Sequence, residues 1–173
     1  MKSGLGLEGG GGLILPTSQY YSCLPEPVTA ATIGTTNVGS NWALGMEVTA
    51  LLTGRIIALK YFREPGGAAT ARSIRLWKPD TTLHETVSFP FTSNLVPIVV
   101  PLVTPLTIQA GQNFIIALDA NNGWGQGTGT VATFPSSAAL DPVDGRADFV
   151  SSTNRPTVVN VGWFGIDCVY AVP

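Results

Sequence analysis

The chain of 173 residues has few charged side chains, because Asp, Glu, Lys and Arg together make up only 12% of it, against about 25% in an average soluble domain. The formal net charge is −2, so the sequence offers no basic surface for nucleic acid or for anionic lipid. The longest apolar runs, such as PIVVPLV at 97–103, contain proline and are far shorter than the roughly 18 residues of a membrane-spanning helix. We therefore expect neither nucleic acid nor a membrane as a partner.

Residues that commonly carry catalysis are also scarce. The one histidine, His84, lies within a strand pattern, and no neighbouring residue suggests the nucleophile and orienting partner that a general base needs. We interpret it as a solvent-facing strand residue. The carboxylates are scattered without the pairing of a glycosidase, and no glycine pattern opens a helix as a phosphate-binding loop does. We expect no enzymatic activity and no cofactor.

Cysteine occurs only twice, at Cys23 and Cys168, without the spacing of a metal site. The two residues are either buried thiols or a long-range disulfide that joins the two ends of the chain. Lys2 is followed by glycines, Glu8 and only three apolar residues, which does not resemble a secretory signal. Disulfides persist mainly in oxidising compartments, so this start of the chain favours free thiols.

Apolar residues alternate with the period of a β-strand through most of the sequence. Leu44, Met46 and Val48 alternate within 43–52, and Ile57, Leu59 and Tyr61 are expected to share one face of a strand at 54–63. Further strand patterns occur at 72–78, 82–89, 97–103, 106–111, 112–120 and 166–171, separated by turn sequences such as EPGG and KPDTT. No helix longer than one turn is indicated. Eight or more short strands predict an all-β fold, a β-sandwich of the jelly-roll kind.

The sequence predicts two parts, an extended arm at 1–18 and a single β-sandwich domain at 19–173. Within the domain, 120–160 is loop-rich, with short strand candidates only at 130–134 and 147–150. Six of the first twelve residues are glycine, so ordering the arm costs much backbone entropy and requires burial against another chain. The docking residues would be Leu5, Leu7, Leu13, Ile14 and Leu15.

Aromatic residues in loops are the best binding signal. Trp124 and Trp163 are surrounded by glycine and asparagine, a composition that suits either a sugar-stacking platform or a plug in a subunit interface. The interface or the core is the favoured interpretation, and Trp42 and Trp77 are expected in the core. A glycan would be bound by Trp124 together with Asn121, Asn122 and Asp119.

One acidic cluster, Asp141, Asp144 and Asp148, lies in a segment that we expect to be a loop. Such carboxylates can bind Ca²⁺, but their spacing is not that of an EF-hand, and Arg146 lies among them. A solvated turn is the favoured interpretation, and no metal is expected.

From about residue 43 to 118 the chain resembles a small domain of unknown function found in bacterial secreted and surface proteins. The resemblance rests on the segments ALGMEV, GRIIALKYFRE, IRLWKPDTTLHETVSF and PLTIQAGQNFIIALDANNG, which look like successive strands of that family. After EPGG the chain has AATARS, where the family usually carries a Gly-Thr-His motif. The resemblance implies a β-sandwich and an adhesive role at a surface, and it suggests no catalytic residue.

The organisation of the whole chain, a sandwich behind a glycine-rich arm, resembles a bacteriophage virion component. This resemblance implies a non-enzymatic structural protein of the head surface, the tail or a fibre, with itself, for example as a trimer, and other virion proteins as partners. The alternative is a carbohydrate-binding adhesion module at an extracellular or cell surface.

Overall fold

The computed structural model describes residues 18–23, 33–36, 42–62, 72–89, 98–120, 124–127, 137–160 and 165–173. Every regular element in these ranges is a β-strand, which confirms the predicted all-β class. No helix in the described ranges has the length and apolarity needed to cross a membrane. The strands are β1 (Gln19–Tyr21), β2 (Ile33–Thr36), β3 (Trp42–Ala50), β4 (Gly54–Tyr61), β5 (Arg72–Trp77), β6 (Leu83–Phe89), β7 (Ile98–Ile108), β8 (Asn113–Ala120), β9 (Trp124–Gly127), β10 (Leu140–Asp148), β11 (Val158–Asn160) and β12 (Ile166–Val172).

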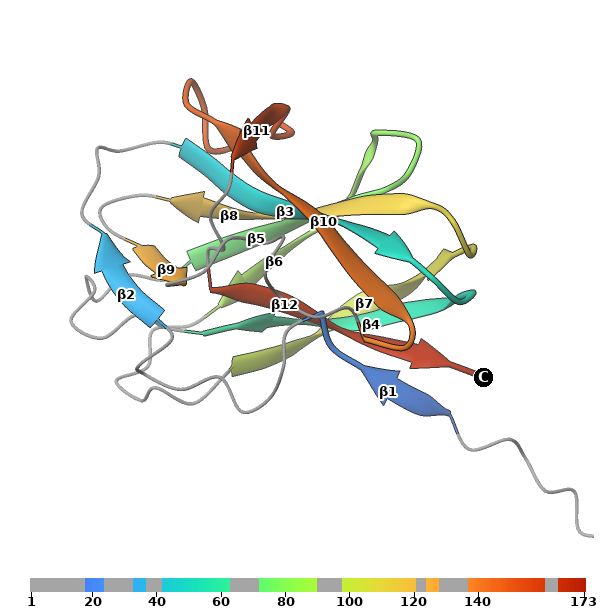
Figure 1. Cartoon of the computed structure of the whole chain (residues 1–173). Helices are drawn as coiled ribbons and strands as arrows, with labels where there is room; N and C mark the ends of the chain where they lie inside the picture. Colours follow the sequence, from blue (N-terminus) through green and yellow to red (C-terminus); the bar gives the residue numbers. More distant parts are fainter. Residues whose placement is uncertain are drawn as a thin grey trace, which may run out of the picture.

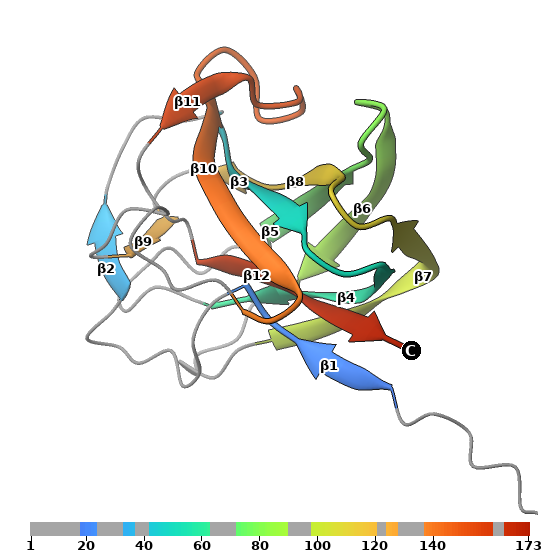
Figure 2. The ribbon, with the colours of Figure 1, turned by 45° about the vertical axis from the view of Figure 1, so that its right-hand side comes forward.

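Two antiparallel sheets face each other as a sandwich (Figures 1 and 2). The smaller sheet has the order β1-β12-β4-β7, and the larger has the order β11-β10-β3-β8-β5-β6. A separate two-stranded ribbon, β2 with β9, lies at one end of the sandwich, near the end of β8 (Figure 1).

The strand pairing is that of a jelly roll. β1 pairs with β12, β3 with β8, β4 with β7 and β5 with β6, so the first of these strands pairs with the last and the others pair in turn toward the middle. Rolling up such a nested ribbon gives two four-stranded sheets, the jelly-roll arrangement. The β10–β11 hairpin extends the larger sheet beyond β3.

The core lies between the two sheets and follows most of the predicted alternation. Leu44, Met46 and Val48 are all at most 1% exposed. In β4, however, Ile56 rather than Ile57 joins Leu59 in the core, because the pairing with β12 shifts by one residue between Ile56 and Ala58. A single extra residue in a strand turns all later side chains to the opposite face, so the predicted grouping of Ile57 with Leu59 is wrong.

Strand β10 occupies a segment that the sequence analysis assigned to a loop-rich connection. Its nine residues pair with β3 through most of their length. Pro142 is tolerated because the register shifts between Pro142 and Asp144, and proline within a sheet is found at such bulges. The expectation of a loop across Asp141, Asp144 and Asp148 is therefore wrong. The predicted arm at 1–18 lies outside the described residues except for Ser18.

Candidate functional site at one end of the sandwich

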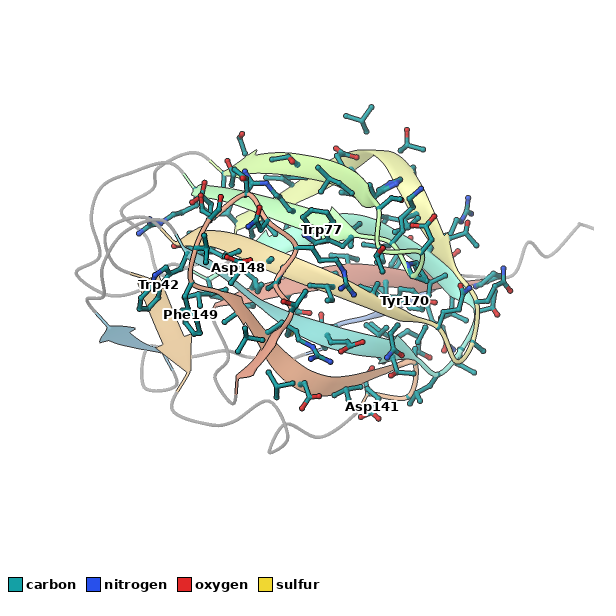
Figure 3. The ribbon with its side chains drawn as sticks, turned by 90° about the horizontal axis from the view of Figure 1, so that it is seen from above. Trp42, Trp77, Asp141, Asp148, Phe149 and Tyr170 are labelled. Atoms are coloured by element: carbon teal, nitrogen blue, oxygen red, sulfur yellow. The ribbon has the colours of Figure 1, made fainter. Side chains whose placement is uncertain are left out.

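Several chemically distinctive side chains gather where β3 begins and where β8 and β10 end. Ala43 lies opposite Asp119 of β8 on one side and opposite Asp148 of β10 on the other. Figure 3 shows Trp42, Asp148 and Phe149 together at this end of the sandwich and Asp141 at the other end of β10. We call this region, with Asp119, the Trp42 end.

An aromatic pair covers the Trp42 end. The rings of Trp42 and Phe149 meet edge to face, with 4.8 Å between their centroids and an angle of 81°. Trp42 also packs against the hydrophobic core, as expected, whereas Phe149 is 46% exposed. The Trp42 ring therefore lies against the core, and the Phe149 ring beside it forms an exposed aromatic surface that a ligand could contact.

An arginine connects the sheet to the turn that follows β10. The Arg75 Nη1 atom donates a hydrogen bond to the carbonyl oxygen of Ser152 over 2.6 Å and lies 4.0 Å from Oδ2 of Asp119. Oδ1 of Asp119 is buried and has no hydrogen-bond partner in the described part of the chain. A buried carboxylate oxygen of this kind can accept a hydrogen bond from a ligand hydroxyl.

The carboxylate of Asp148 holds the same turn. Its Oδ1 atom accepts hydrogen bonds from the backbone N–H groups of Val150 and Ser151, over 2.8 and 2.9 Å, and Asn154 donates to Oδ2 over 3.3 Å. The hydrogen bond from Ser151 is the largest cause that lowers the pKa of Asp148 below its ordinary value. Asp148 thus has a structural role in this turn.

A charged pair lies further along β3 and β10, on the outer face of the larger sheet. Glu47 accepts hydrogen bonds from Arg146 and, over 2.9 Å, from Asn113, and Arg146 also lies 3.7 Å from Asp144. Burial alone would raise the pKa of Glu47, but the hydrogen bonds from Asn113 and Arg146 lower it overall. These contacts place the positive charge of Arg146 between the carboxylates of Glu47 and Asp144.

The other predicted site residues have different positions. His84 is half-buried, and its Nε2 atom lies 2.8 Å from the carbonyl oxygen of Thr104. Trp77 is half-buried on β5 rather than fully in the core. For Trp124, which begins β9, only the backbone is described. The remaining predicted residues lie outside the described ranges: Leu5, Leu7, Leu13, Ile14, Leu15, Asn121, Asn122 and Trp163.

The structure also brings together a buried group that the sequence analysis recognised only in part. Cys23, Asp167 and Cys168 each place a potential metal-ligand atom within 4.8 Å of the other two, and no other such group occurs in the described ranges. Burial raises the pKa of Asp167 to about 6, against the lowering effect of hydrogen bonds from the backbone of Cys23 and Cys168 and of the Lys60 charge. The signal for Asp167 in the sequence was a single charge within an apolar strand.

The strand topology defines the class of this protein, a jelly-roll module. A family model described as Domain of unknown function (DUF4082) matches residues 28–156, about three quarters of the chain. The chain belongs to this family. The match includes the segment in which the sequence resembled a domain of unknown function, and it extends beyond that segment at both ends. No curated protein matches the chain.

Proposed function

We propose that this protein is a non-enzymatic structural module that associates with copies of itself on the surface of a particle, a bacteriophage virion by the resemblance of its organisation. The observation that carries the proposal is the edge of the larger sheet. Within the described ranges, strand β11 pairs with β10 alone, and its Val158 and Val159 are 49% and 58% exposed. Val150, in the turn before it, is 81% exposed.

An exposed edge strand with apolar side chains favours pairing with another chain. Its free backbone N–H and C=O groups can extend a ladder, and the apolar side chains gain from leaving water. Most proteins protect such an edge with lysine, proline or a covering loop. Because the copies would be identical, β11 of one copy facing β11 of another makes a symmetric contact. The fold is compatible with this role, since jelly rolls build viral capsid proteins as well as lectins, although a fold alone does not define a function.

The test is the solution mass of the full chain by light scattering over a concentration series. We expect an oligomer, and we expect Val159→Lys to raise the dissociation constant at least tenfold, because it places a charge in the contact. Val103→Lys is the matched control, since Val103 is 90% exposed on β7 of the other sheet. A full chain that remains monomeric throughout the series would overturn the proposal.

The arm contributes a second, separable contact. In this proposal Leu5, Leu7, Leu13, Ile14 and Leu15 dock on a neighbouring subunit or on another virion protein. A chain that starts at Ser18 should then associate more weakly than the full chain in the same light-scattering series. Equal masses for the two chains would assign the association to the sandwich alone.

A second function, glycan binding at the Trp42 end, is favoured by the unpartnered Oδ1 atom of Asp119 beside Arg75 and the exposed ring of Phe149. Sugars are typically bound by stacking on aromatic rings and by hydrogen bonds to carboxylates. A glycan array would identify a ligand, and Asp119→Asn and Phe149→Ala should each weaken the binding of that ligand at least tenfold. Asp80→Asn, in the exposed β5–β6 turn, is the control. Unchanged binding in the first two variants would exclude this site.

A further inference from the structure

Cys23 and Cys168 are free thiols in the structure, the form that the start of the sequence favours. We infer that they form a disulfide on oxidation, which covalently joins the segment directly after β1 to β12, the last strand of the jelly roll. This inference is independent of the proposed function. Both cysteines lie outside residues 28–156, so the pair is a feature of this chain beyond the segment that defines its family.

The register of the smaller sheet places the two cysteines opposite each other. In the β1–β12 ladder Gln19 is opposite Val172, Tyr20 opposite Ala171 and Tyr21 opposite Tyr170. Continuing this antiparallel register by two residues beyond Tyr21 and Tyr170 places Cys23 opposite Cys168. Directly opposed residues on antiparallel strands have Cα atoms about 4.5–5.5 Å apart, which is within the range that a disulfide requires.

The side chains already point toward each other inside the protein. The two Sγ atoms are 3.9 Å apart, and both residues are at most 1% exposed. Forming the bond requires the sulfur atoms to approach to about 2.05 Å, a movement that side-chain rotation and a small strand adjustment can supply. The backbone N–H groups of Cys23 and Cys168 both donate to Oδ1 of Asp167, over 2.9 and 2.7 Å. This shared acceptor holds the two backbone segments together before any covalent bond exists.

The local electrostatics oppose a thiolate at either cysteine of the folded chain, so the buried pair is stable only as neutral thiols or as a neutral disulfide. The Asp167 carboxylate lies beside both sulfur atoms, and a second negative charge at this buried place would be costly. A disulfide carries no charge and leaves Asp167 facing Lys60, its partner across the β12–β4 ladder.

Formation of the bond needs an oxidant, which we take to be a small disulfide such as oxidised glutathione. One cysteine thiolate attacks the small disulfide and releases one thiol, and the second cysteine thiolate then attacks the mixed disulfide and releases the other. The two protein thiols lose two protons and two electrons, and the oxidant becomes two thiols. Because both sulfur atoms are buried, this exchange occurs when β1 separates from β12 or before the chain has folded.

The consequence lies at the edge of the smaller sheet. Strand β1 has three residues, and among the strands that the structure describes it pairs with β12 alone, so without the bond it should be among the first elements to separate. The bond would close a loop between residues 145 positions apart and would restrict the unfolded chain strongly.

The test uses the full chain, incubated with oxidised glutathione, unfolded and alkylated with iodoacetamide. We expect a mass two hydrogens lower than that of the reduced chain, no alkylated cysteine, and one cross-linked peptide pair that contains Cys23 and Cys168. Reduction should then expose two alkylatable thiols. It should also lower Tm by about 10 °C or more and accelerate amide exchange in β1 at least tenfold, with β3 and β8 unchanged.

The variant Cys23→Ala is the matched control, because its Tm and its β1 exchange should not respond to reductant. If it fails to fold, the mass and peptide measurements on the unaltered chain still decide the question. Two alkylatable thiols after oxidation, glutathione adducts, or disulfide-linked dimers would overturn the inference. The inference would also be overturned if the two thiols resisted alkylation only in the presence of zinc and reacted again after a chelator was added. In that case Cys23, Asp167 and Cys168 would form a metal site.

Discussion

Asp167 shows how one buried carboxyl can make the stability of the whole protein depend on pH. The residue is fully buried, and burial raises its pKa from 3.8 to about 6 in spite of the hydrogen bonds from Cys23 and Cys168. Between these two values the folded chain binds a proton that the unfolded chain has already lost. The stability that this group contributes is therefore fully present below about pH 3.8, falls as the pH rises to about 6, and stays constant above it.

We expect the variant Asp167→Asn to lose this pH dependence. A pKa shift of about two units corresponds to about 3 kcal/mol. As the pH rises from 3.5 to 7, the original chain should therefore lose about that much free energy of unfolding through Asp167, and the variant should not. Urea denaturation of the two chains at a series of pH values measures this difference. A difference between the chains that stays constant with pH would contradict the prediction.

Thr81, in the turn between β5 and β6, is the one non-glycine residue of the described ranges with a positive φ, at 71°. A Cβ atom in the left-handed region costs about 1–2 kcal/mol, and a β-branched side chain tolerates that region poorly. We expect Thr81→Gly to raise the free energy of unfolding by about 0.5–1 kcal/mol, measured by urea denaturation.

Gly111 provides the reverse test of the same effect. Its φ is +82°, and a Cβ atom there would meet nothing within 4 Å, so Gly111→Ala adds backbone strain without a clash. It should destabilise the fold by about 1 kcal/mol. An increase in stability for Gly111→Ala, or a loss for Thr81→Gly, would show that the backbone conformations differ from those described.

At the scale of elements, the turn between β10 and β11 is held by three different contacts. Arg75 donates a hydrogen bond to the Ser152 carbonyl oxygen, Asp148 accepts hydrogen bonds from the first residues of the turn, and Phe149 packs on Trp42. These contacts fix both the Trp42 end and the start of β11, the edge on which the proposed association depends.

We expect Arg75→Ala to loosen this turn selectively, because the buried carbonyl group of Ser152 loses a charged donor. Amide exchange in residues 150–154 should accelerate at least tenfold, while exchange in β3 and β8 should change little. Arg55→Ala is the control, since Arg55 is exposed on β4 of the other sheet. Equal exchange in the two variants would show that Asp148 and Phe149 hold the turn without Arg75.

At the scale of the whole molecule, the nested pairing brings the two ends of the domain together. Gln19 lies opposite Val172, and Figure 2 shows the end of β12 beside β1. A chain whose ends are this close should tolerate being joined there and opened elsewhere.

We therefore expect a circular permutant of residues 18–173 to fold. A linker of about five glycine and serine residues would join Pro173 to Ser18, and the chain would be opened between Asp80 and Thr81. The new ends fall in an exposed turn, so Tm should stay within about 10 °C of that of the uninterrupted 18–173 chain, measured by circular dichroism. Loss of cooperative unfolding would contradict the nested topology.

The sequence predicted the fold class and most of the strands of the jelly roll because their apolar alternation is a local signal. It divided β7 wrongly into two strands, at 97–103 and 106–111, and it did not predict β10, whose LDPVDGRAD segment has the composition of a turn. That strand exists because β3 offers a free edge and because Glu47 neutralises Arg146. At the Trp42 end, the sequence indicated Asp119 as a glycan-binding residue and Trp42 only as a core residue. It did not indicate Arg75 or Phe149, since nothing local connects them to this end.

The sequence by itself determined that the chain forms strands and, apart from the bulge in β4, most of the side chains that face the core, because a strand alternates its faces every residue and hydrophobic burial acts on that alternation directly. Only the tertiary structure decided which strands pair, where the bulge in β4 lies, and that Cys23 meets Cys168 across 145 positions. These features arise from contacts between distant segments, and such contacts leave no periodic signal in the sequence.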